Sequence, residues 1–135
     1  MDKKLNCILL IDDDEPTNFL NKRMLEEMEC AHTIQVIQKA PEALEYLKKT
    51  AIQNDGNTPF PDLIFLDINM PAMDGWEFLD VYKTINKPDH PVSLIMLTTS
   101  LNPEDEQKAM ESSQVTGFKS KPLTQEIVRD ILRRL

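Results

Sequence analysis

Aspartate, threonine and lysine residues directly follow short apolar runs, and together they could carry phosphate chemistry. Asp12 and Asp13 end one run, Asp67 and Thr98 end two others, and Lys121 lies just beyond a short fourth run. Clustered carboxylates repel each other unless a cation lies between them, and oxygen-only ligands suit Mg²⁺. A carboxylate can also attack phosphorus and form an aspartyl phosphate. A lysine ammonium and a threonine hydroxyl can bind phosphoryl oxygens, so the combination indicates phosphoryl chemistry.

These residues can meet only if the apolar runs form neighbouring strands of one sheet. Runs of strand length at 7–11, 33–37, 63–66, 92–97 and 116–118 alternate with helix-period segments at 14–29, 41–51, 75–85, 102–112 and 124–135. Continuous apolar character, as at 7–11, is typical of a strand covered on both faces. The alternation predicts an α/β fold, a (βα)5 doubly wound parallel five-stranded sheet. Its expected strand order is the flavodoxin-like 2-1-3-4-5.

That strand order predicts one site. The strands that end before Asp12, at Asp67 and at Thr98 are neighbours, and the strand before Lys121 lies next to them. In open parallel sheets, sites form beyond the carboxyl ends of the central strands. We therefore expect these side chains to converge on one edge of the sheet.

The helices show ordinary signals. Asp14 and Asp74 are interpreted as helix caps or solvent-exposed residues rather than site residues. The first helix is expected to bury an apolar stripe. Its members are Phe19, Leu20, Met24, Leu25 and Met28.

Composition excludes several other classes of protein. The 135 residues suit one domain, with 41% apolar and 28% charged residues. The net charge of -8 argues against a general nucleic-acid binder, because phosphate backbones attract basic surfaces. Cys7 and Cys30 are too few for a disulfide framework and are expected to be reduced thiols. No apolar stretch approaches the ~20 residues of a membrane span, so a cytoplasmic location without membrane contact is expected.

The segment Leu66–Gly75, LDINMPAMDG, resembles the phosphoacceptor segment of response-regulator receiver domains of bacterial two-component systems, which include the chemotaxis regulators. Ile11-Asp12-Asp13, Leu97-Thr98 and Lys121-Pro122 are similar to the other signature positions of that family. The resemblance covers nearly the whole chain. It implies a single receiver domain over residues 1–135, without an output domain.

The resemblance also implies roles for the site residues. Asp67 would accept a phosphoryl group from a phosphohistidine on a sensor histidine kinase or phosphotransfer protein. Asp13 and Asp67 would bind Mg²⁺ together with the backbone carbonyl of Asn69, and Asp12 would act through a coordinated water. Thr98 and Lys121 would bind the phosphoryl oxygens.

Two further residues carry expectations from the resemblance. Phe118 would be the switch aromatic, which turns inward when the Thr98 hydroxyl moves. Pro122 would follow a cis peptide bond, a bond type essentially confined to proline. Beyond its own phosphotransfer and autodephosphorylation, the chain is not expected to be an enzyme. Its output is expected to pass to a downstream protein partner, through a phosphorelay, or through a homodimer formed by the fourth helix, fifth strand and fifth helix.

The sequence departs from the family pattern near the phosphoacceptor. Thr99 is bulkier than the residues often found there, and Asn69 and Ser100 occupy variable positions that tune phosphate hydrolysis, which leaves the phosphate lifetime open. The loop at 53–61 and the run Thr98-Thr99-Ser100 look most like single-domain regulators associated with bacterial phytochrome kinases.

Two alternatives remain at this point. Asp12 and Asp14 form an Asp-x-Asp pair after a strand, as in haloacid-dehalogenase-like phosphatases, but that hypothesis leaves Asp67 unexplained and lacks a late acidic pair and a cap insertion. The other alternative is a pseudo-receiver, a binding module that is never phosphorylated. The complete signature argues against it.

Overall fold

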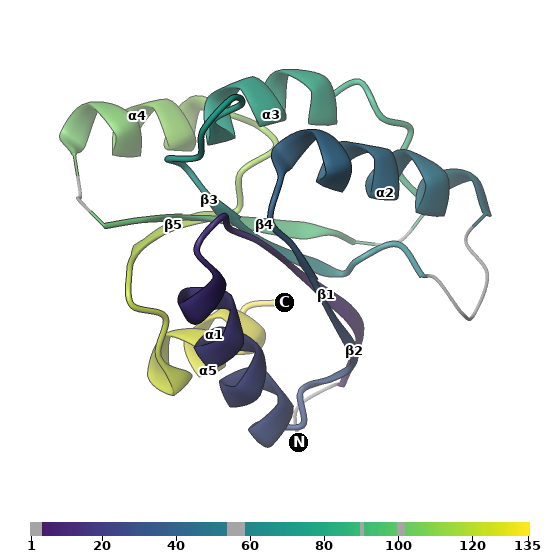
Figure 1. Ribbon diagram of the computed structural model, residues 1–135, viewed down its shortest axis with the longest axis vertical. Helices are drawn as coiled ribbons and strands as arrows, with labels where there is room; N and C mark the ends of the chain where they lie inside the picture. The colour runs from purple at the N-terminus through teal and green to yellow at the C-terminus, as the bar shows by residue number, and fades with distance from the viewer. Residues whose placement is uncertain (1–3, 54–58, 90, 100–101) are drawn as a thin grey trace.

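A parallel sheet lies between two layers of helices in the computed structural model (Figure 1), which describes residues 4–53, 59–89, 91–99 and 102–135. The strands are β1 (Leu5–Ile11), β2 (Ala31–Ile37), β3 (Leu63–Asp67), β4 (Ser93–Thr98) and β5 (Gly117–Ser120). The helices are α1 (Glu15–Glu27), α2 (Ala40–Gln53), α3 (Gly75–Tyr82), α4 (Pro103–Glu111) and α5 (Gln125–Arg133). All pairings are parallel, and the order β2-β1-β3-β4-β5 confirms the predicted fold.

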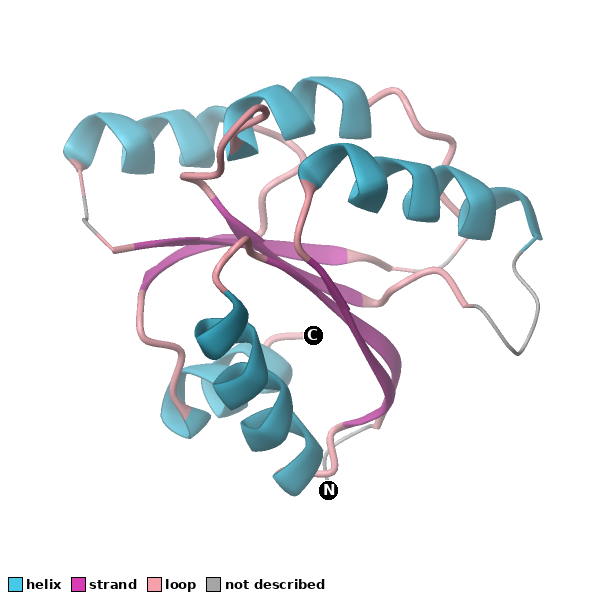
Figure 2. Ribbon diagram, in the orientation of Figure 1, coloured by secondary structure: helices cyan, strands magenta, loops and turns pink. Residues whose placement is uncertain are grey.

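Each face of the sheet has its own apolar core. α2, α3 and α4 cover one face, and α1 and α5 cover the other (Figure 2). Within β1, Leu9 and Ile11 belong to the cluster beneath α2–α4, whereas Ile8 and Leu10 belong to the cluster above α1 and α5. The continuous apolar run therefore forms a strand that is buried on both sides, as such runs predict.

The observed ends of the elements differ from the predicted ones by a few residues. α3 ends at Tyr82 rather than at Ile85. The Lys87 ammonium donates to the carbonyls of Tyr82 and Ile85, at 3.1 and 3.3 Å, so a side chain pairs with carbonyls near the helix end. β5 extends to Ser120, so the polar residues Lys119 and Ser120 are part of the strand.

The predicted apolar stripe of α1 is wrong in its first turns. Phe19 and Leu20 are each 64% exposed, and Asn18, Asn21 and Leu25 are the buried residues of the helix. The amide Nδ2 of Asn18 donates to the backbone carbonyl of Asp12 at 2.7 Å. The start of α1 lies against the loop after β1, where the carbonyl of Asp12 needs a hydrogen-bond donor. The amide of Asn18 therefore points inward, and Phe19 and Leu20 point outward.

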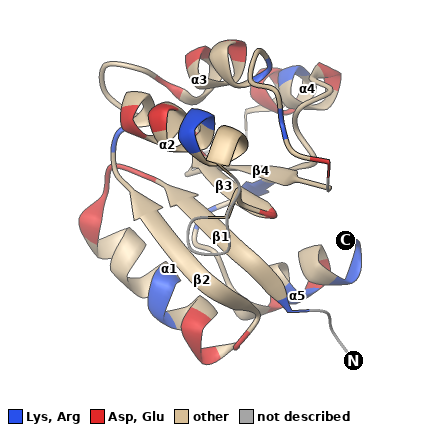
Figure 3. Ribbon diagram, turned by 90° about the vertical axis from the view of Figure 1, so that its right-hand side faces the viewer, with Lys and Arg blue, Asp and Glu red and all other residues tan. Residues whose placement is uncertain are grey.

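The charged residues lie mainly on the helices and loops (Figure 3). Cys7 and Cys30 are buried free thiols. Burial raises the pKa of the Cys7 thiol to about 11, and its side chain meets the Tyr46 hydroxyl from α2. Among the described helices, none combines the length and the apolar character needed to cross a membrane.

Candidate functional site

The carboxyl ends of four strands meet at one edge of the sheet. Ile11 lies opposite Leu66 in the β1–β3 pairing, so Asp12 and Asp67 each stand one residue further along. Asp67 in turn pairs with Leu97, and Thr98 pairs with Ser120 at the end of β5. The register alone thus brings the predicted acidic and hydroxyl residues to the same place.

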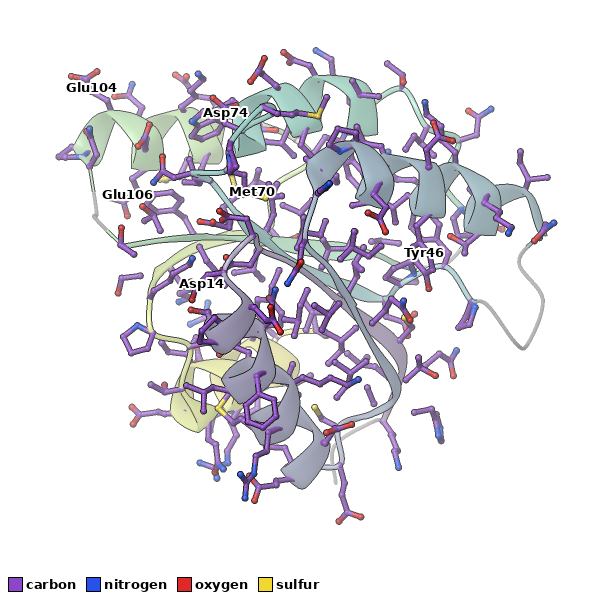
Figure 4. The ribbon with its side chains drawn as sticks, viewed as in Figure 1. Asp14, Tyr46, Met70, Asp74, Glu104 and Glu106 are labelled. Carbon is purple, nitrogen blue, oxygen red and sulfur yellow. The ribbon has the colours of Figure 1, made fainter. Side chains whose placement is uncertain are left out.

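Three carboxylates converge at this edge. Oxygens of Asp12, Asp13 and Asp67 all lie within 4.8 Å of one another. Asp12 and Asp67 are buried, whereas Asp13 is exposed. Figure 4 shows Asp14 at the start of α1 and Met70 in the loop after β3, on opposite sides of the strand ends. A compact all-oxygen donor set with one solvent-facing carboxylate fits a hard divalent cation such as Mg²⁺.

Lys121 is the cation within this cluster. Its Nζ lies 2.7 Å from Oδ2 of Asp12 and 3.2 Å from Oδ1 of Asp67. The backbone N of Lys121 donates to the carbonyl of Thr98 at 2.7 Å, and the Lys121–Pro122 peptide bond is cis. One ammonium group therefore neutralises part of the charge of two buried carboxylates.

The electrostatics of the cluster follow from burial and crowding. Burial first, and the charge of Asp12 second, raise the pKa of Asp67 to about 6, although Lys121 acts in the opposite direction. Burial lowers the pKa of the Lys121 ammonium, but the hydrogen bond and charge of Asp12 and the charge of Asp67 outweigh it, so this pKa is raised. Burial and the charge of Asp12 therefore disfavour the ionised form of Asp67, and a cation bound beside it would favour that form.

The other predicted site residues surround the cluster. Thr98 is buried at the end of β4, and Phe118 is half-buried on β5 against the α2–α4 core. Asn69 is exposed, and its backbone N lies 3.4 Å from Oδ1 of Asp67. Thr99 is exposed. Ser100 and residues 54–58 of the long loop lie outside the described residues.

Local capping fixes the starts of α1 and α3, the helices that follow the strands of Asp12 and Asp67. Asp14 caps α1, where its carboxylate accepts hydrogen bonds from the Thr17 amide and hydroxyl. Asp74 forms a capping box with Glu77 at the start of α3. Asp14 and Asp74 were predicted to be helix caps or solvent-exposed residues, and both are helix caps.

The loop between β3 and α3 packs closely. The Gly75 amide donates to the Ile68 carbonyl at 2.8 Å, and a Cβ at position 75 would lie 3.0 Å from the Ile68 Cα and 3.2 Å from the Asp67 carbonyl oxygen. Ala72 adopts a φ of 70° in the same loop. Glycine at 75 therefore lets α3 begin directly against the end of β3.

Sequence reasoning missed Asn18. It is 3% exposed, and it bonds to the backbone of a residue in the acidic cluster. A signal was present, since Asn18, Asn21 and Leu25 share a helical spacing of three and four residues. The apolar pattern of Phe19 and Leu20 concealed it.

Comparison with known proteins gives consistent matches. The family model of the response regulator receiver domain matches residues 8–133. The chain is 31% identical over 99 residues to the response regulator Rcp1 of Synechocystis, which covers 73% of this chain and 65% of that protein. A two component response regulator from Cytophaga hutchinsonii has a TM-score of 0.87 and 32% identity, with 98% and 97% of the two chains covered. The Vibrio cholerae chemotaxis protein CheY4 has a TM-score of 0.70 and 25% identity, with 96% and 98% covered.

The matched region is one part of many larger relatives. The chain spans 72, 23 and 65% of the length of three curated relatives, and 6% of a hybrid histidine kinase from Dictyostelium discoideum. Neither the phosphatase nor the pseudo-receiver alternative is favoured by these matches. With a family match over nearly the whole chain and the predicted sheet order in place, the protein belongs to the response regulator receiver domain family.

Proposed function

We propose that Asp67 is the phosphoacceptor of a two-component response regulator, and that residues 1–135 act as a single receiver domain. The observation that carries this proposal is the convergence of two further carboxylates and Lys121 on one buried aspartate. An isolated aspartate at a strand end would need none of them. The partner would be a histidine kinase or a phosphotransfer protein.

The transfer is a single displacement at phosphorus. A carboxylate oxygen of Asp67 forms an O–P bond while the N–P bond of the phosphohistidine breaks, and the electron pair returns to the imidazole of the donor. Lys121, already 3.2 Å from Asp67, would hold a phosphoryl oxygen, and the Thr98 hydroxyl would donate to another. The same groups would serve the later attack of water on phosphorus, in which the Asp67 O–P bond breaks, the carboxylate is restored and phosphate leaves.

Asp13, Asp67 and the backbone carbonyl of Asn69 would hold Mg²⁺, with Asp12 acting through a coordinated water. Bound Mg²⁺ would neutralise the clustered carboxylates and the incoming phosphoryl oxygens. Lys121 would then leave its 2.7 Å contact with Asp12 and turn to the phosphoryl group. This exchange of partners is how the site would change on activation.

Thr98 and Phe118 would transmit the change to the surface. Thr98 lies opposite Ser120 in the β4–β5 pairing, two residues after Phe118. A movement of the Thr98 hydroxyl toward the phosphate would free space that Phe118 fills, and the face made of α4, β5 and α5 would repack. α4 is suited to this role, because Ala109 is the only buried residue in it and Met110 is 78% exposed.

The phosphodonor would approach along a groove that reaches the cluster. A groove of about 480 Å³ runs between the start of α1 and the loops that follow β4 and β5. Its lining residues include Leu20, Asn21, Met24, Thr99, Lys121 and Pro122. Lys121 belongs to both the groove and the acidic cluster, so a helix bearing the phosphohistidine could rest on the exposed Phe19 and Leu20 with its imidazole near Asp67.

The proposal is tested by phosphorylation with acetyl phosphate. We expect the wild-type protein to gain one phosphoryl group in the presence of Mg²⁺ and to gain none in EDTA, as measured by intact-protein mass spectrometry. Asp67→Asn should abolish the modification, because an amide oxygen is too weak a nucleophile. Asp74→Asn is the matched control, since Asn also caps helices and Asp74 lies outside the acidic group. Modification of Asp67→Asn at the wild-type rate would refute the assignment.

Output through a homodimer is a separate part of the proposal. β5 is the edge strand of the sheet beside α4 and α5, so a second copy could pack against that face. Multi-angle light scattering with and without beryllofluoride should show a higher mass with the phosphoryl mimic. Identical masses over a tenfold range of protein concentration would contradict the homodimer, without bearing on Asp67.

A further inference from the structure

One buried side chain near the site is held in an unusual way. Asn18 on α1 is 3% exposed, and its Nδ2 donates to the backbone carbonyl of Asp12 at 2.7 Å. Its Oδ1 has no hydrogen-bond partner among the described residues. A buried carbonyl without a partner is unfavourable, so packing alone does not favour an amide at this position.

The contact that Asn18 does make is with a residue of the acidic cluster. Asp12 is held by four hydrogen bonds. Its backbone N donates to the Ile37 carbonyl at 3.3 Å, and its carbonyl accepts from Asn18. Its Oδ1 accepts from the backbone N of Asp14 at 2.9 Å, and its Oδ2 accepts from Lys121 at 2.7 Å. Two of these bonds use the carboxylate itself, and the one from Lys121 competes with any cation at the cluster. The bond from Asn18 uses the backbone, so it can persist whichever partner the carboxylate takes.

We infer that Asn18 is a positioning residue, which holds the Asp12–Asp13 backbone so that both carboxylates face Asp67 when Mg²⁺ binds. This inference rests on the magnesium site proposed above. α1 thus contributes to the metal site through one side-chain hydrogen bond to the main chain, although none of its residues belongs to the acidic group. Residues that orient metal ligands in this way typically change metal affinity by 10–100-fold when they are replaced.

The test compares two leucine substitutions on the same helix. Asn18→Leu removes the donor and keeps the branched shape of the side chain. Asn21→Leu is the matched control, because Asn21 is also buried on α1 but is not bonded to Asp12. Asn21 lines the proposed donor groove, but a Mg²⁺ titration contains no phosphodonor. Mg²⁺ affinity is measured by titration calorimetry, and the melting temperature is measured in EDTA. We expect Asn18→Leu to weaken Mg²⁺ binding about tenfold without a lower melting temperature, and Asn21→Leu to leave the affinity within about twofold.

A second measurement reads the metal-free protein. The amide of Asp14 donates to the Asp12 carboxylate, so its hydrogen exchange reports whether the loop is held. In EDTA, this exchange should become faster in Asn18→Leu and should stay unchanged in Asn21→Leu. If Asn18→Leu fails to fold, Asn18→Ser, which is too short to bridge to the carbonyl, replaces it in both measurements.

The outcomes separate this inference from the proposed function. Wild-type Mg²⁺ affinity in Asn18→Leu, or equal losses in both variants, would overturn the inference alone. An absence of Mg²⁺ binding by the wild-type protein would overturn the proposed metal site and the inference together.

Discussion

The junctions β1–α1 and β3–α3 both place carboxylates at the same site, but different kinds of contact hold the two junctions in place. At β3–α3, Gly75 brings α3 against the backbone of Asp67 and Ile68, and a capping box closes the helix start. At β1–α1, the side chain of Asn18 reaches back to the Asp12 carbonyl. The β3–α3 junction depends on close contact between backbones, and the β1–α1 junction depends on side-chain hydrogen bonds made by Asp12, Asp14 and Asn18.

The two helices also differ in where their large apolar side chains lie. The apolar residues Phe78 and Leu79 of α3 are buried in the core, whereas Phe19 and Leu20 of α1 face outward. We interpret β3–α3 as the junction that fixes Asp67, the proposed phosphoacceptor. In this interpretation, β1–α1 is the junction that adjusts the metal ligands and meets the phosphodonor.

The largest effect is expected from tightening the contact at β3–α3. Gly75→Ala would place a Cβ 3.0 Å from the Ile68 Cα and 3.2 Å from the Asp67 carbonyl oxygen, and neither backbone atom can move freely. We expect the free energy of unfolding to fall by about 2 kcal/mol, as measured by urea unfolding.

The matched control for Gly75→Ala is Gly117→Ala on β5. Its Cβ would meet only the end of a flexible side chain, Ile95 Cδ1 at 2.9 Å, so the loss should be about 1 kcal/mol or less. Equal losses for the two variants would show that backbone contact does not distinguish the β3–α3 junction.

The two junctions also differ in how far the sequence predicts them. The β3–α3 junction is encoded by local signals: an apolar run, an aspartate, and proline and glycine at fixed positions in Met70–Gly75. The sheet order and the convergence of Asp12, Asp67 and Thr98 followed from the alternation of elements, because parallel strands carry their carboxyl ends to one edge.

The β1–α1 junction could not be predicted in the same way. A prediction from periodicity considers only where apolar residues recur, and by that criterion Phe19 and Leu20 belong to a stripe that faces the core. The orientation of α1 depends instead on a loop carbonyl that needs a donor, which is a tertiary requirement. The 2.7 Å contact between Lys121 and Asp12 joins residues 109 positions apart, so no local pattern could assign it.

The second prediction concerns the outer surface of α1. Leu20→Lys removes an apolar contact from the proposed donor-docking groove, and we expect phosphotransfer from a phosphorylated histidine phosphotransfer protein to slow by about tenfold. The rate with acetyl phosphate should stay within about twofold, since that small donor needs no docking surface.

The control for Leu20→Lys is Ile52→Lys at the far end of α2, where Ile52 is 85% exposed. This variant carries the same change in charge and should transfer at the wild-type rate. A slower rate with acetyl phosphate in Leu20→Lys would place the defect at the cluster rather than at docking. If Leu20→Lys and the wild-type protein accepted phosphate from the protein donor at equal rates, the proposed role of α1 in docking would be refuted.

The smallest effect tests backbone strain in the two regions. Ala72 has a φ of 70° in the β3–α3 loop, and Glu29 has a φ of 51° just after the end of α1. Both values lie in the left-handed region, where glycine is favoured. Ala72→Gly and Glu29→Gly should each raise the free energy of unfolding by about 0.5 kcal/mol, because relief of strain outweighs the added freedom of the unfolded chain.

The free energies of unfolding of these two variants, measured in urea, test whether backbone contacts alone hold the β3–α3 junction. Met73 N donates to the Pro71 carbonyl at 2.8 Å, so backbone contacts should hold the β3–α3 loop even with glycine at position 72. If Ala72→Gly lost stability while Glu29→Gly gained it, the loop would need the stiffness that alanine provides. Backbone packing around Gly75 would then be insufficient to fix the position of Asp67, and the two junctions would be more alike than their contacts indicate.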